Sequence, residues 1–568
     1  MVDYQAQYKY WLEHAPVSYR DMLQAMQGND QALKECFGAE LSFGTAGIRS
    51  IMGLGCNRLN EFTVRRTAQG IAKWLNGTDL PKRCAIGYDS RHNSRLYAEI
   101  CAAALAETGI QVHIYHELAP TPMLSYAVRE LHCGVGIMVT ASHNAGMYNG
   151  IKCYGEDGCQ MTDEPAAIVY REIQNTPYFV LPEKSFDALK TEGMIEDIPL
   201  SLWTAYCDRV VQEGLDLERV KRSGLHVLYT PLCGTGNKPV RELFRRIGVK
   251  ADVVSVQEKA DGDFKTCTYP NPETDAALNE CYKLARELHP DLIIGTDPDA
   301  DRVAIAVPVN GEFRKLSGNE LGCVLLDYIL RMRTERGDLP DGAEAIKSIV
   351  STPMADKIAE AYNVKMLNVL TGFKYIGGEI LRLEALKQEN CFVFGFEESC
   401  GYLKGSYARD KDAVVASMLV CEAAAYAKEN GMNLADYMDA LYRQFGCYAA
   451  CVQSEELQGV SANEISKAFM TNIRENCPAE LAGCKVTATV DYLSGVRNCL
   501  KCGMEEATDL PESNVFTLEL GEQGKIILRP SGTEPKIKLY YTAVGETWDA
   551  ANARLAQFKE AMSGFLPA

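Results

Sequence analysis

Three aspartates, Asp297, Asp299 and Asp301, alternate with other residues in the stretch Gly-Thr-Asp-Pro-Asp-Ala-Asp-Arg. Three carboxylates this close in one short loop repel one another strongly unless a cation compensates their charge. Carboxylate oxygens with few other ligands suit Mg²⁺, which keeps coordination places for water and phosphate oxygens. An EF-hand calcium loop is excluded, because Arg302 takes the place of its glycine. A solvated acidic turn is the alternative, and the apolar residues on both sides of the loop disfavour it.

A second polar loop, Thr-Ala-Ser-His-Asn at 140–144, directly follows a short apolar stretch. A serine at the junction of a strand and a loop can be held rigid and exposed, as a covalent phosphoryl carrier must be, and Ser142 is the candidate. Gly146 and Gly150 let backbone N–H groups approach phosphate oxygens, and Lys152 adds positive charge. The alternative is a loop whose side chains only stabilise its own turns, and this loop alone leaves both interpretations open.

Two further polar loops offer groups for a phosphorylated sugar. The stretch Phe-Glu-Glu-Ser-Cys-Gly-Tyr at 396–402 follows an apolar stretch, and Glu397 and Ser399 could bind vicinal sugar hydroxyls. The stretch Arg-Pro-Ser-Gly-Thr-Glu-Pro-Lys at 529–536 is suited to bind a phosphate through a bidentate guanidinium, hydroxyls and backbone N–H groups. The alternative for residues 529–536 is a hairpin with a basic residue beside it.

Three other patterns carry weaker signals. The charged run Arg-Asp-Lys-Asp at 409–412 is predicted to be a solvated turn, as most such runs are. Residues 371–374, Thr-Gly-Phe-Lys, are compatible with either a binding loop or an ordinary turn. Cys499 and Cys502 form a CxxC motif without a second pair, which disfavours a zinc or redox site.

Alternating strand and helix patterns must position these loops. Such alternation predicts parallel sheets covered by helices, and it occurs in three successive units, each of which ends a strand in one of the first three loops. In open sheets of this kind, ligands bind beyond the carboxyl ends of the strands. Residues 515–544 instead predict an antiparallel meander, followed by a helix with one apolar stripe.

The length of 568 residues predicts about four domains at ~150 residues each. We place the last boundary in the least patterned stretch, residues 444–485. The predicted domains are residues 1–205 with the Ser142 loop, 206–315 with the aspartate loop, 316–445 with the Glu397 loop and 446–568 with the Arg529 loop.

The charge and composition restrict the class of partner. With 58 basic and 76 acidic residues, the formal net charge is −18, which disfavours binding to nucleic acid or to an anionic membrane. No apolar stretch is long enough to span a bilayer, and the amino terminus shows no signal-peptide pattern. The 21 cysteines are best interpreted as reduced thiols. We therefore predict a cytoplasmic protein that binds a small phosphorylated molecule, and we make no prediction of its oligomeric state.

In this order, the four loops resemble those of the α-D-phosphohexomutase superfamily, which includes phosphoglucomutases and phosphomannomutases. Thr-Ala-Ser-His-Asn resembles its phosphoserine loop, Asp-Pro-Asp-Ala-Asp-Arg its metal loop, Glu-Glu-Ser its sugar loop and Arg-Pro-Ser-Gly-Thr-Glu-Pro its phosphate loop. Phe-Gly-Thr-Ala-Gly-Ile-Arg at 43–49 resembles its amino-terminal signature, and residues 371–374 its third-domain glycine loop. The resemblance implies an α/β fold of four domains around a central cleft, with three related α/β units that contain mixed sheets and a smaller C-terminal α+β domain.

The resemblance also implies a mechanism. Ser142 carries a phosphoryl group, donates it to a sugar monophosphate, and takes the other phosphate back from the resulting bisphosphate. Mg²⁺ is held by the three aspartates and a phosphate oxygen on Ser142. The nearest candidate for the general acid/base is His143, with Lys411 a weaker one. The implied site residues are Ser142, His143, Arg49, Lys152 and Lys411 for catalysis, Ser142, Asp297, Asp299 and Asp301 for the metal, and Arg302, Thr371, Gly372, Lys374, Glu397, Ser399, Arg529, Ser531, Gly532 and Thr533 for the substrate.

The choice of sugar rests on the sugar loop. Glu-Glu-Ser resembles glucose-type enzymes more than the Glu-Met-Ser of dual-specificity enzymes, so we predict a phosphoglucomutase that interconverts α-D-glucose 1-phosphate and glucose 6-phosphate, with glucose 1,6-bisphosphate as intermediate and activator. Phosphomannomutase, phosphopentomutase and glucose-1,6-bisphosphate synthase stay open as alternatives. A metal-dependent sugar phosphatase is disfavoured by the 529–536 loop. A catalytically silent protein would be expected to lack Ser142 or an aspartate of the cluster, and none is missing.

Overall fold

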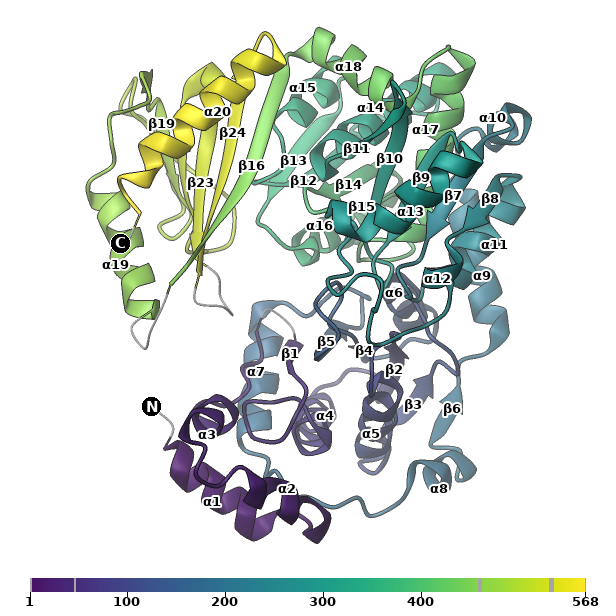
Figure 1. The fold of residues 1–568 in the computed structure, drawn as a ribbon, viewed down its shortest axis with the longest axis vertical. Coiled ribbons are helices and arrows are strands. Elements are labelled where there is room, and N and C mark those ends of the chain that lie inside the picture. Colours follow the sequence, from purple (N-terminus) through teal and green to yellow (C-terminus); the bar gives the residue numbers. More distant parts are fainter. Residues whose placement is uncertain (1–2, 45–46, 458–461, 531–535, 567–568) are drawn as a thin grey trace.

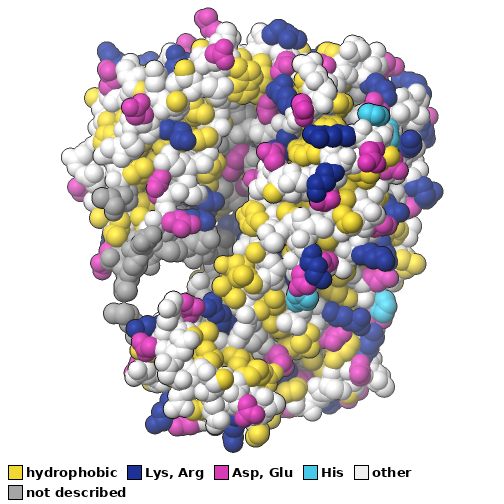
Figure 2. Space-filling model, viewed as in Figure 1, with side chains coloured by type: hydrophobic (Ala, Val, Ile, Leu, Met, Phe, Trp, Pro, Cys, Tyr) yellow, Lys and Arg dark blue, Asp and Glu magenta, His cyan; other side chains and the backbone are white. Residues whose placement is uncertain are grey.

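The chain forms four larger sheets, one in each of four domains. Figure 1 shows the domains following one another in an arc from the purple amino-terminal end to the yellow carboxyl-terminal end. The structure is a computed structural model that describes residues 3–44, 47–457, 462–530 and 536–566. Figure 2 shows this face of the molecule hollowed by a deep notch between the first and fourth domains. The predicted fold class is confirmed.

The first domain alternates helices and strands around a mixed sheet. Its elements are α1 (Tyr4–His14), η1 (Val17–Tyr19), α2 (Arg20–Ala25), α3 (Asp30–Phe37), β1 (Gly47–Ile51), α4 (Glu61–Asn76), β2 (Arg83–Tyr88), α5 (Ser94–Ala106), β3 (Gln111–Ile114), α6 (Thr121–Glu130), β4 (Val135–Val139), β5 (Tyr148–Gly155), α7 (Asp163–Gln174), α8 (Phe186–Thr191), β6 (Ile195–Asp197) and α9 (Leu200–Gln212). The strand order is β1-β5-β4-β2-β3-β6. Because β4 lies inside the sheet and all five of its residues are buried, the loop that follows it starts from a fixed position.

The second domain carries the aspartates on a hairpin. Its elements are α10 (Leu217–Ser223), β7 (His226–Thr230), α11 (Asn237–Ile247), β8 (Lys250–Val253), α12 (Ser255–Glu258), α13 (Asp275–Leu288), β9 (Leu292–Thr296), β10 (Val303–Val309) and β11 (Glu312–Leu316). The strand order is β11-β10-β9-β7-β8, and β9 pairs antiparallel with β10. The apolar residues on either side of the aspartates are therefore two buried strands, which hold both ends of the aspartate loop.

The third domain places the sugar loop at the end of an inner strand. Its elements are α14 (Gly318–Arg336), β12 (Glu344–Ser348), α15 (Met354–Ala361), β13 (Lys365–Val369), α16 (Phe373–Ala385), η2 (Glu389–Cys391), β14 (Phe392–Glu397), β15 (Gly401–Leu403), α17 (Ala413–Glu429) and α18 (Leu434–Phe445). The strand order is β13-β12-β14-β15. β14 pairs in parallel with β12 and antiparallel with β15, so the turn after Glu397 connects two paired strands.

The fourth domain is an antiparallel sheet with helices. Its elements are β16 (Cys447–Glu456), α19 (Ala462–Glu475), β17 (Glu480–Leu481), β18 (Cys484–Lys485), β19 (Ala488–Asp491), β20 (Val496–Cys499), β21 (Glu505–Ala507), β22 (Phe516–Glu519), η3 (Gly521–Gln523), β23 (Gly524–Pro530), β24 (Lys536–Gly545) and α20 (Trp548–Ser563). The larger sheet has the order β16-β24-β23-β22-β19-β20-β21. The stretch 444–485, in which we saw little pattern, contains β16 and α19. The small and polar residues of β16 gave a weak strand signal, and its pairing with β24 over ten residues supplies what its sequence lacks.

The predicted domain bounds stay predictions. The four larger sheets fall within the predicted residue ranges, except that β11 ends at Leu316, one residue past the second range. The fourth domain contacts the third through a small apolar cluster, in which Ile349 and Leu370 lie with Ile527 and Tyr540. Among the described residues, no helix combines the length and hydrophobicity needed to cross a membrane.

A half-buried lysine at this contact predicts a pH-dependent stability. Lys525 on β23 donates a hydrogen bond to the carbonyl of Ile349 at 2.6 Å. Burial, together with the nearby charge of Lys347, lowers the pKa of Lys525 to about 7. Because its pKa in the unfolded chain lies near 10.4, the unfolded state binds more protons between about pH 7 and pH 10, and the burial cost falls as the pH rises.

We therefore expect Lys525→Met to be most stabilising relative to the wild type at pH 6. This advantage in free energy of unfolding is expected to shrink by roughly 2–4 kcal/mol by pH 10. Urea titrations at pH 6, 8 and 10 measure it, and Lys559→Met on exposed α20 surface is the control. A difference that is the same at all three pH values would contradict the prediction.

Candidate active site

Ser142 lies three residues beyond the end of β4 and is held from several sides. Its backbone has a φ of 51°, the left-handed region that few residues other than glycine adopt. Its N–H donates to Thr140 Oγ1 at 2.8 Å. Its hydroxyl donates to Oδ2 of Asp297 at 2.9 Å and lies 3.1 Å from Nδ1 of His143. The side chain of the first domain that we predicted to carry phosphate thus contacts the aspartate loop of the second.

The three aspartates form one buried cluster. Each offers a carboxylate oxygen, and these oxygens all lie within 4.8 Å of one another. Oδ1 of Asp297 accepts hydrogen bonds from the backbone N–H groups of Asp301 and Arg302, at 3.1 and 3.0 Å. Oδ2 of Asp299 accepts one from Thr121 Oγ1 at 2.9 Å. By contrast, the buried Oδ1 atoms of Asp299 and Asp301 have no hydrogen-bond partner in the described part of the chain.

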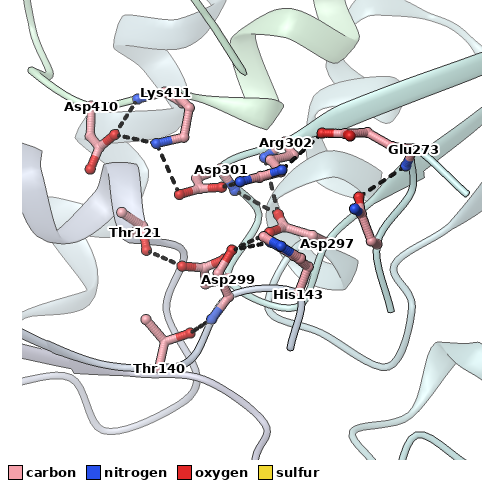
Figure 3. A network of polar contacts seen from close by, with 12 residues as sticks. Thr121, Thr140, His143, Glu273, Asp297, Asp299, Asp301, Arg302, Asp410 and Lys411 are labelled. Carbon is pink, nitrogen blue, oxygen red and sulfur yellow. Dashed lines mark hydrogen bonds and ion pairs between the residues drawn. The ribbon is translucent and has the colours of Figure 1, made fainter. Parts of the chain in front are cut away.

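Basic side chains from two other domains compensate part of this charge, as Figure 3 shows for Lys411. Lys152 on β5 lies 2.7 Å from Oδ2 of Asp299 and 3.2 Å from Oδ2 of Asp301. Lys411 lies 3.2 Å from the same oxygen of Asp301 and 2.8 Å from Asp410. The cluster is therefore the point at which the first, second and third domains meet.

The pKa values of the aspartates differ because of their neighbours. Burial, together with the charges of Asp299 and Asp301, raises the pKa of Asp297 well above its usual value. Burial acts on Asp301 too, but the charges of Lys152 and Lys411 outweigh it and hold the pKa of Asp301 below its usual value. An all-oxygen donor set, in which two buried oxygens have no hydrogen-bond partner among the described residues, fits a hard divalent cation, and such a cation would favour the ionised form of Asp297.

His143 and Lys411 are the two candidates for the general acid/base, and their pKa values are shifted in opposite directions. Burial, followed by the charges of Arg302 and Arg49, holds the pKa of His143 well below its usual value. Burial would lower the pKa of Lys411, but Asp301 and Asp410 outweigh it and raise that pKa. At neutral pH the imidazole is therefore uncharged and can accept a proton, whereas the ammonium keeps its charge.

The sugar loop and the 371–374 loop contact each other. Glu397, at the end of β14, accepts a hydrogen bond through Oε1 from the backbone N–H of Gly372 at 2.7 Å. Gly372 has a φ of 125°, a backbone conformation that residues other than glycine rarely adopt. Ser399 is half-buried in the turn between β14 and β15, and Thr371 Oγ1 is buried without a hydrogen-bond partner in the residues described. Both loops therefore present polar groups at one place.

Sequence comparison matches the chain over all four domains. The matching family models are Phosphoglucomutase/phosphomannomutase alpha/beta/alpha domain I at residues 40–178, domain II at 204–310, domain III at 317–445 and the C-terminal domain at 517–559. The chain belongs to the phosphoglucomutase/phosphomannomutase family. It is accordingly a mutase.

Individual relatives support this membership. A phosphoglucomutase of Staphylococcus aureus strain USA300 is 37% identical over 533 residues, which cover 93% of this chain and 94% of the relative. The open form of pp63/parafusin, a phosphoglucomutase from Paramecium, has a TM-score of 0.66 at 18% identity and covers 93% of this chain and 96% of its own. An Aspergillus fumigatus N-acetylphosphoglucosamine mutase, solved with GlcNAc-6P and magnesium, has a TM-score of 0.50 at 13% identity and covers 93% and 97%. At these identities the two structures show the fold alone.

Of three further predicted site residues of this family member, Lys374 and Arg49 contact groups outside the carboxylate cluster, and Arg302 contacts the cluster itself. Lys374 forms an ion pair with Asp163 of α7 at 2.6 Å, and so connects the third domain to the first. Arg49 on β1 donates to Oδ1 of Asn144 at 3.1 Å, at the edge of the Ser142 loop. Arg302 pairs with Glu273 at 2.8 Å and lies 3.9 Å from Asp301.

The predicted phosphate loop is described only in part. Arg529 stands near the end of β23. Burial raises the pKa of the Tyr540 hydroxyl to about 12, and the charge of Glu398 adds to this rise whereas Arg529 opposes it. Arg529 on β23 and Glu398 in the sugar loop therefore both lie near the side chain of Tyr540. Ser531, Gly532 and Thr533 lie outside the described residues.

The prediction of a solvated turn at 409–412 was wrong. Arg409, Asp410 and Asp412 are at most 1% exposed, and Lys411 is 8% exposed. Asp410 accepts a hydrogen bond from the Tyr154 hydroxyl at 2.8 Å, and Asp412 caps α17 and accepts from two more tyrosines. Tertiary partners, and not water, satisfy this charged run.

The sequence reasoning also missed a set of residues that support the site. Residues 261–273 of the second domain cover the Ser142 loop: Asp263 pairs with His92, and the Tyr269 ring lies edge-on to His143 with centroids 5.6 Å apart. Beneath the loop lies Arg91, two residues after Asp89. A signal was available, because Tyr-Asp-Ser-Arg at 88–91 follows an apolar strand just as the other polar loops do.

Proposed function

We propose that this family member is a phosphoglucomutase that interconverts α-D-glucose 1-phosphate and glucose 6-phosphate. The observation that carries the proposal is the 2.9 Å contact between Ser142 Oγ and a carboxylate of a buried cluster suited to a divalent cation. This contact supports the proposal, because a phosphoryl group carried on Ser142 would lie where its charge can be compensated. The Staphylococcus aureus relatives named phosphoglucomutase, 36–37% identical, favour glucose as the sugar.

The chain's own residues divide the work of phosphoryl transfer. Asp297, Asp299 and Asp301 would hold Mg²⁺, whose charge offsets that of the transferring phosphoryl group. The magnesium in the Aspergillus mutase structure supports this choice of cation. Lys152 and Arg302 add positive charge at the same place. Ser142 carries the phosphoryl group between the two ends of the sugar, with glucose 1,6-bisphosphate as the intermediate.

His143 is the better candidate to handle the proton. Its Nδ1 lies 3.1 Å from Ser142 Oγ, and burial keeps the ring neutral. We propose that it takes the proton from the attacking sugar hydroxyl and returns it in the reverse step. Lys411, which stays charged, would act by electrostatic attraction on the phosphate.

The remaining loops would bind the sugar and its second phosphate. Glu397 would accept hydrogen bonds from the sugar hydroxyls, and Ser399 would donate hydrogen bonds to them. Arg529, together with Ser531, Gly532 and Thr533, would bind the phosphate that does not react. Because the bisphosphate must bind in two orientations, both loops have to accept either end of the sugar.

A substrate panel tests the sugar specificity. With Mg²⁺ and a trace of glucose 1,6-bisphosphate, we expect kcat/KM for glucose 1-phosphate to exceed those for mannose 1-phosphate, ribose 1-phosphate and N-acetylglucosamine 1-phosphate by about tenfold or more, the range that one mismatched hydroxyl gives. Coupled assays measure each isomerisation, and phosphate release is measured in parallel. A higher kcat/KM for mannose or ribose phosphate would overturn the choice of glucose, and phosphate release as fast as isomerisation would indicate a phosphatase.

A further inference from the structure

Arg91 is a buried arginine directly beneath the Ser142 loop. It follows β2, and β2 pairs in parallel with β4, so the ends of the two strands lie side by side. Its side chain is fully buried, and so is that of its ion-pair partner Asp89. A buried charge is costly to a protein, so the burial of this guanidinium calls for an explanation.

The guanidinium of Arg91 is bound by carbonyl oxygens of the Ser142 loop. Nη1 donates to the carbonyls of Ala145 and Tyr148, at 2.9 and 3.0 Å. Nη2 donates to the carbonyl of Ser142 at 2.6 Å and also to that of Asn144. Four carbonyls between residues 142 and 148 are therefore held by one planar cation.

Asp89 connects the same cation to the backbone of Ser142. Its Oδ2 lies 3.2 Å from Nε of Arg91 and accepts a hydrogen bond from Thr140 Oγ1 at 2.7 Å. Thr140 Oγ1 in turn accepts the N–H of Ser142 at 2.8 Å. The N–H and the carbonyl of Ser142 are thus both fixed by one ion pair, which explains how the residue keeps its left-handed conformation.

The second domain covers the other side of the guanidinium. The ring of Phe264 lies 5.0 Å from the guanidinium carbon of Arg91. Gly146 of the loop lies so close to Gly262 that a side-chain carbon there would come within 2.6 Å of the Gly262 carbonyl. The loop is therefore fixed between Arg91 and the domain that carries the aspartates.

We propose that Arg91 is a positioning residue, which holds the loop by its carbonyls and so fixes the Ser142 oxygen against the carboxylate cluster during phosphoryl transfer. This inference rests on the proposed function. Arginine suits the role because its rigid planar fork can hold several acceptors at once, whereas a lysine ammonium is a compact donor on a flexible stem. Its effect should be large, because a displacement of about 1 Å at reacting atoms can cost about 10²-fold in rate.

The test compares two buried arginines of the first domain. Arg91→Lys is expected to lower kcat about 10²-fold and to leave KM within about threefold, because other loops bind the sugar and its second phosphate. Arg65→Lys is the matched control. Arg65 is 7% exposed, donates to the carbonyl of Val180 at 2.9 Å and pairs with Glu107, and none of these contacts involves the Ser142 loop. We expect this variant to keep kcat near the wild-type value.

Thr140→Val is a second, nearly isosteric variant, and it decides the matter if Arg91→Lys fails to fold. It removes the hydroxyl between Asp89 and the Ser142 N–H, and we expect kcat to fall about tenfold with KM unchanged. For each variant, intact mass spectrometry follows the rate at which Ser142 takes a phosphoryl group from glucose 1,6-bisphosphate. That rate should fall in parallel with kcat.

Two outcomes would overturn the role of Arg91. One is a wild-type kcat in Arg91→Lys or, where that variant does not fold, in Thr140→Val. The other is an equal loss of kcat in Arg65→Lys, which would indicate a general effect of buried arginines on stability. A wild-type protein that takes no phosphoryl group from glucose 1,6-bisphosphate and isomerises none of the sugar phosphates would instead overturn the proposed function.

Discussion

Ser142→Ala is expected to lower kcat/KM for glucose 1-phosphate by about 10⁴-fold or more, because the variant has no atom to carry the phosphoryl group. Its fold should be unchanged, since the hydrogen bonds of Ser142 Oγ to described residues are those with His143 and Asp297. In the wild type, incubation with glucose 1,6-bisphosphate should add the mass of one phosphoryl group. In Ser142→Ala it should add none.

Ser417→Ala is the matched control for the loss of a buried serine hydroxyl. Ser417 is fully buried in α17 and, among the residues that the structure describes, donates only to the carbonyl of Ala413 at 2.7 Å. This variant should keep both the activity and the phosphorylation of the wild type. More than a tenth of the wild-type activity in Ser142→Ala, or a phosphoryl group still attached to it, would show that another residue is the carrier.

The local parts of the site could be predicted from the sequence. The buried strand β4 shows as five consecutive apolar residues, and the aspartates stand between two more strands of the same kind. Ligands bind at the carboxyl ends of strands in such sheets, so the positions of the two loops after their strands predict that both belong to a binding site. The 2.9 Å contact between Ser142 and Asp297, which are 155 residues apart, could not be read from spacing.

Buried charge was the feature that sequence patterns failed to predict. Residues 409–412 have the composition of a solvated turn, yet tyrosines more than 200 residues away bind two of their carboxylates. Within the described residues, the Arg91 guanidinium likewise has no local partner other than Asp89, and its four carbonyl acceptors lie more than 50 residues further along the chain. A charged side chain is predicted to be exposed unless the sequence indicates a group that pairs with it. Here the pairing groups come from distant parts of the chain, which only the fold brings close.

Lys374 illustrates a different ambiguity, at a contact between domains. Lys374 was assigned to the substrate through the glycine loop that it follows, and the structure pairs it with Asp163 of the first domain. A basic residue next to a binding loop therefore has two possible roles, contact with an anion or contact between domains. Only the three-dimensional arrangement shows that Asp163 is within reach.

Asp299→Asn is expected to abolish the dependence on Mg²⁺ together with the activity. In the wild type, three buried carboxylates face two lysines, and the Oδ1 atoms of Asp299 and Asp301 have no hydrogen-bond partner among the described residues. A divalent cation that binds these oxygens stabilises the folded state, by about 2.7 kcal/mol at a concentration of 100 times its Kd. Mg²⁺ should therefore raise the Tm of the wild type and leave that of Asp299→Asn unchanged.

The activity of Asp299→Asn should be lower by about 10³-fold, since the metal is expected to supply several kcal/mol of charge compensation in the transition state. Asp252→Asn is the control, because Asp252 lies on β8 of the same domain and pairs with His226, outside the cluster. It should respond to Mg²⁺ as the wild type does. Full activity of the wild type after treatment with EDTA, or an equal rise in Tm for Asp299→Asn, would show that the cluster serves only as a partner for Lys152 and Lys411. The Oδ1 atoms of Asp299 and Asp301 argue against that outcome, because the lysines already have access to the cluster and yet neither oxygen has a hydrogen-bond partner in the described part of the chain.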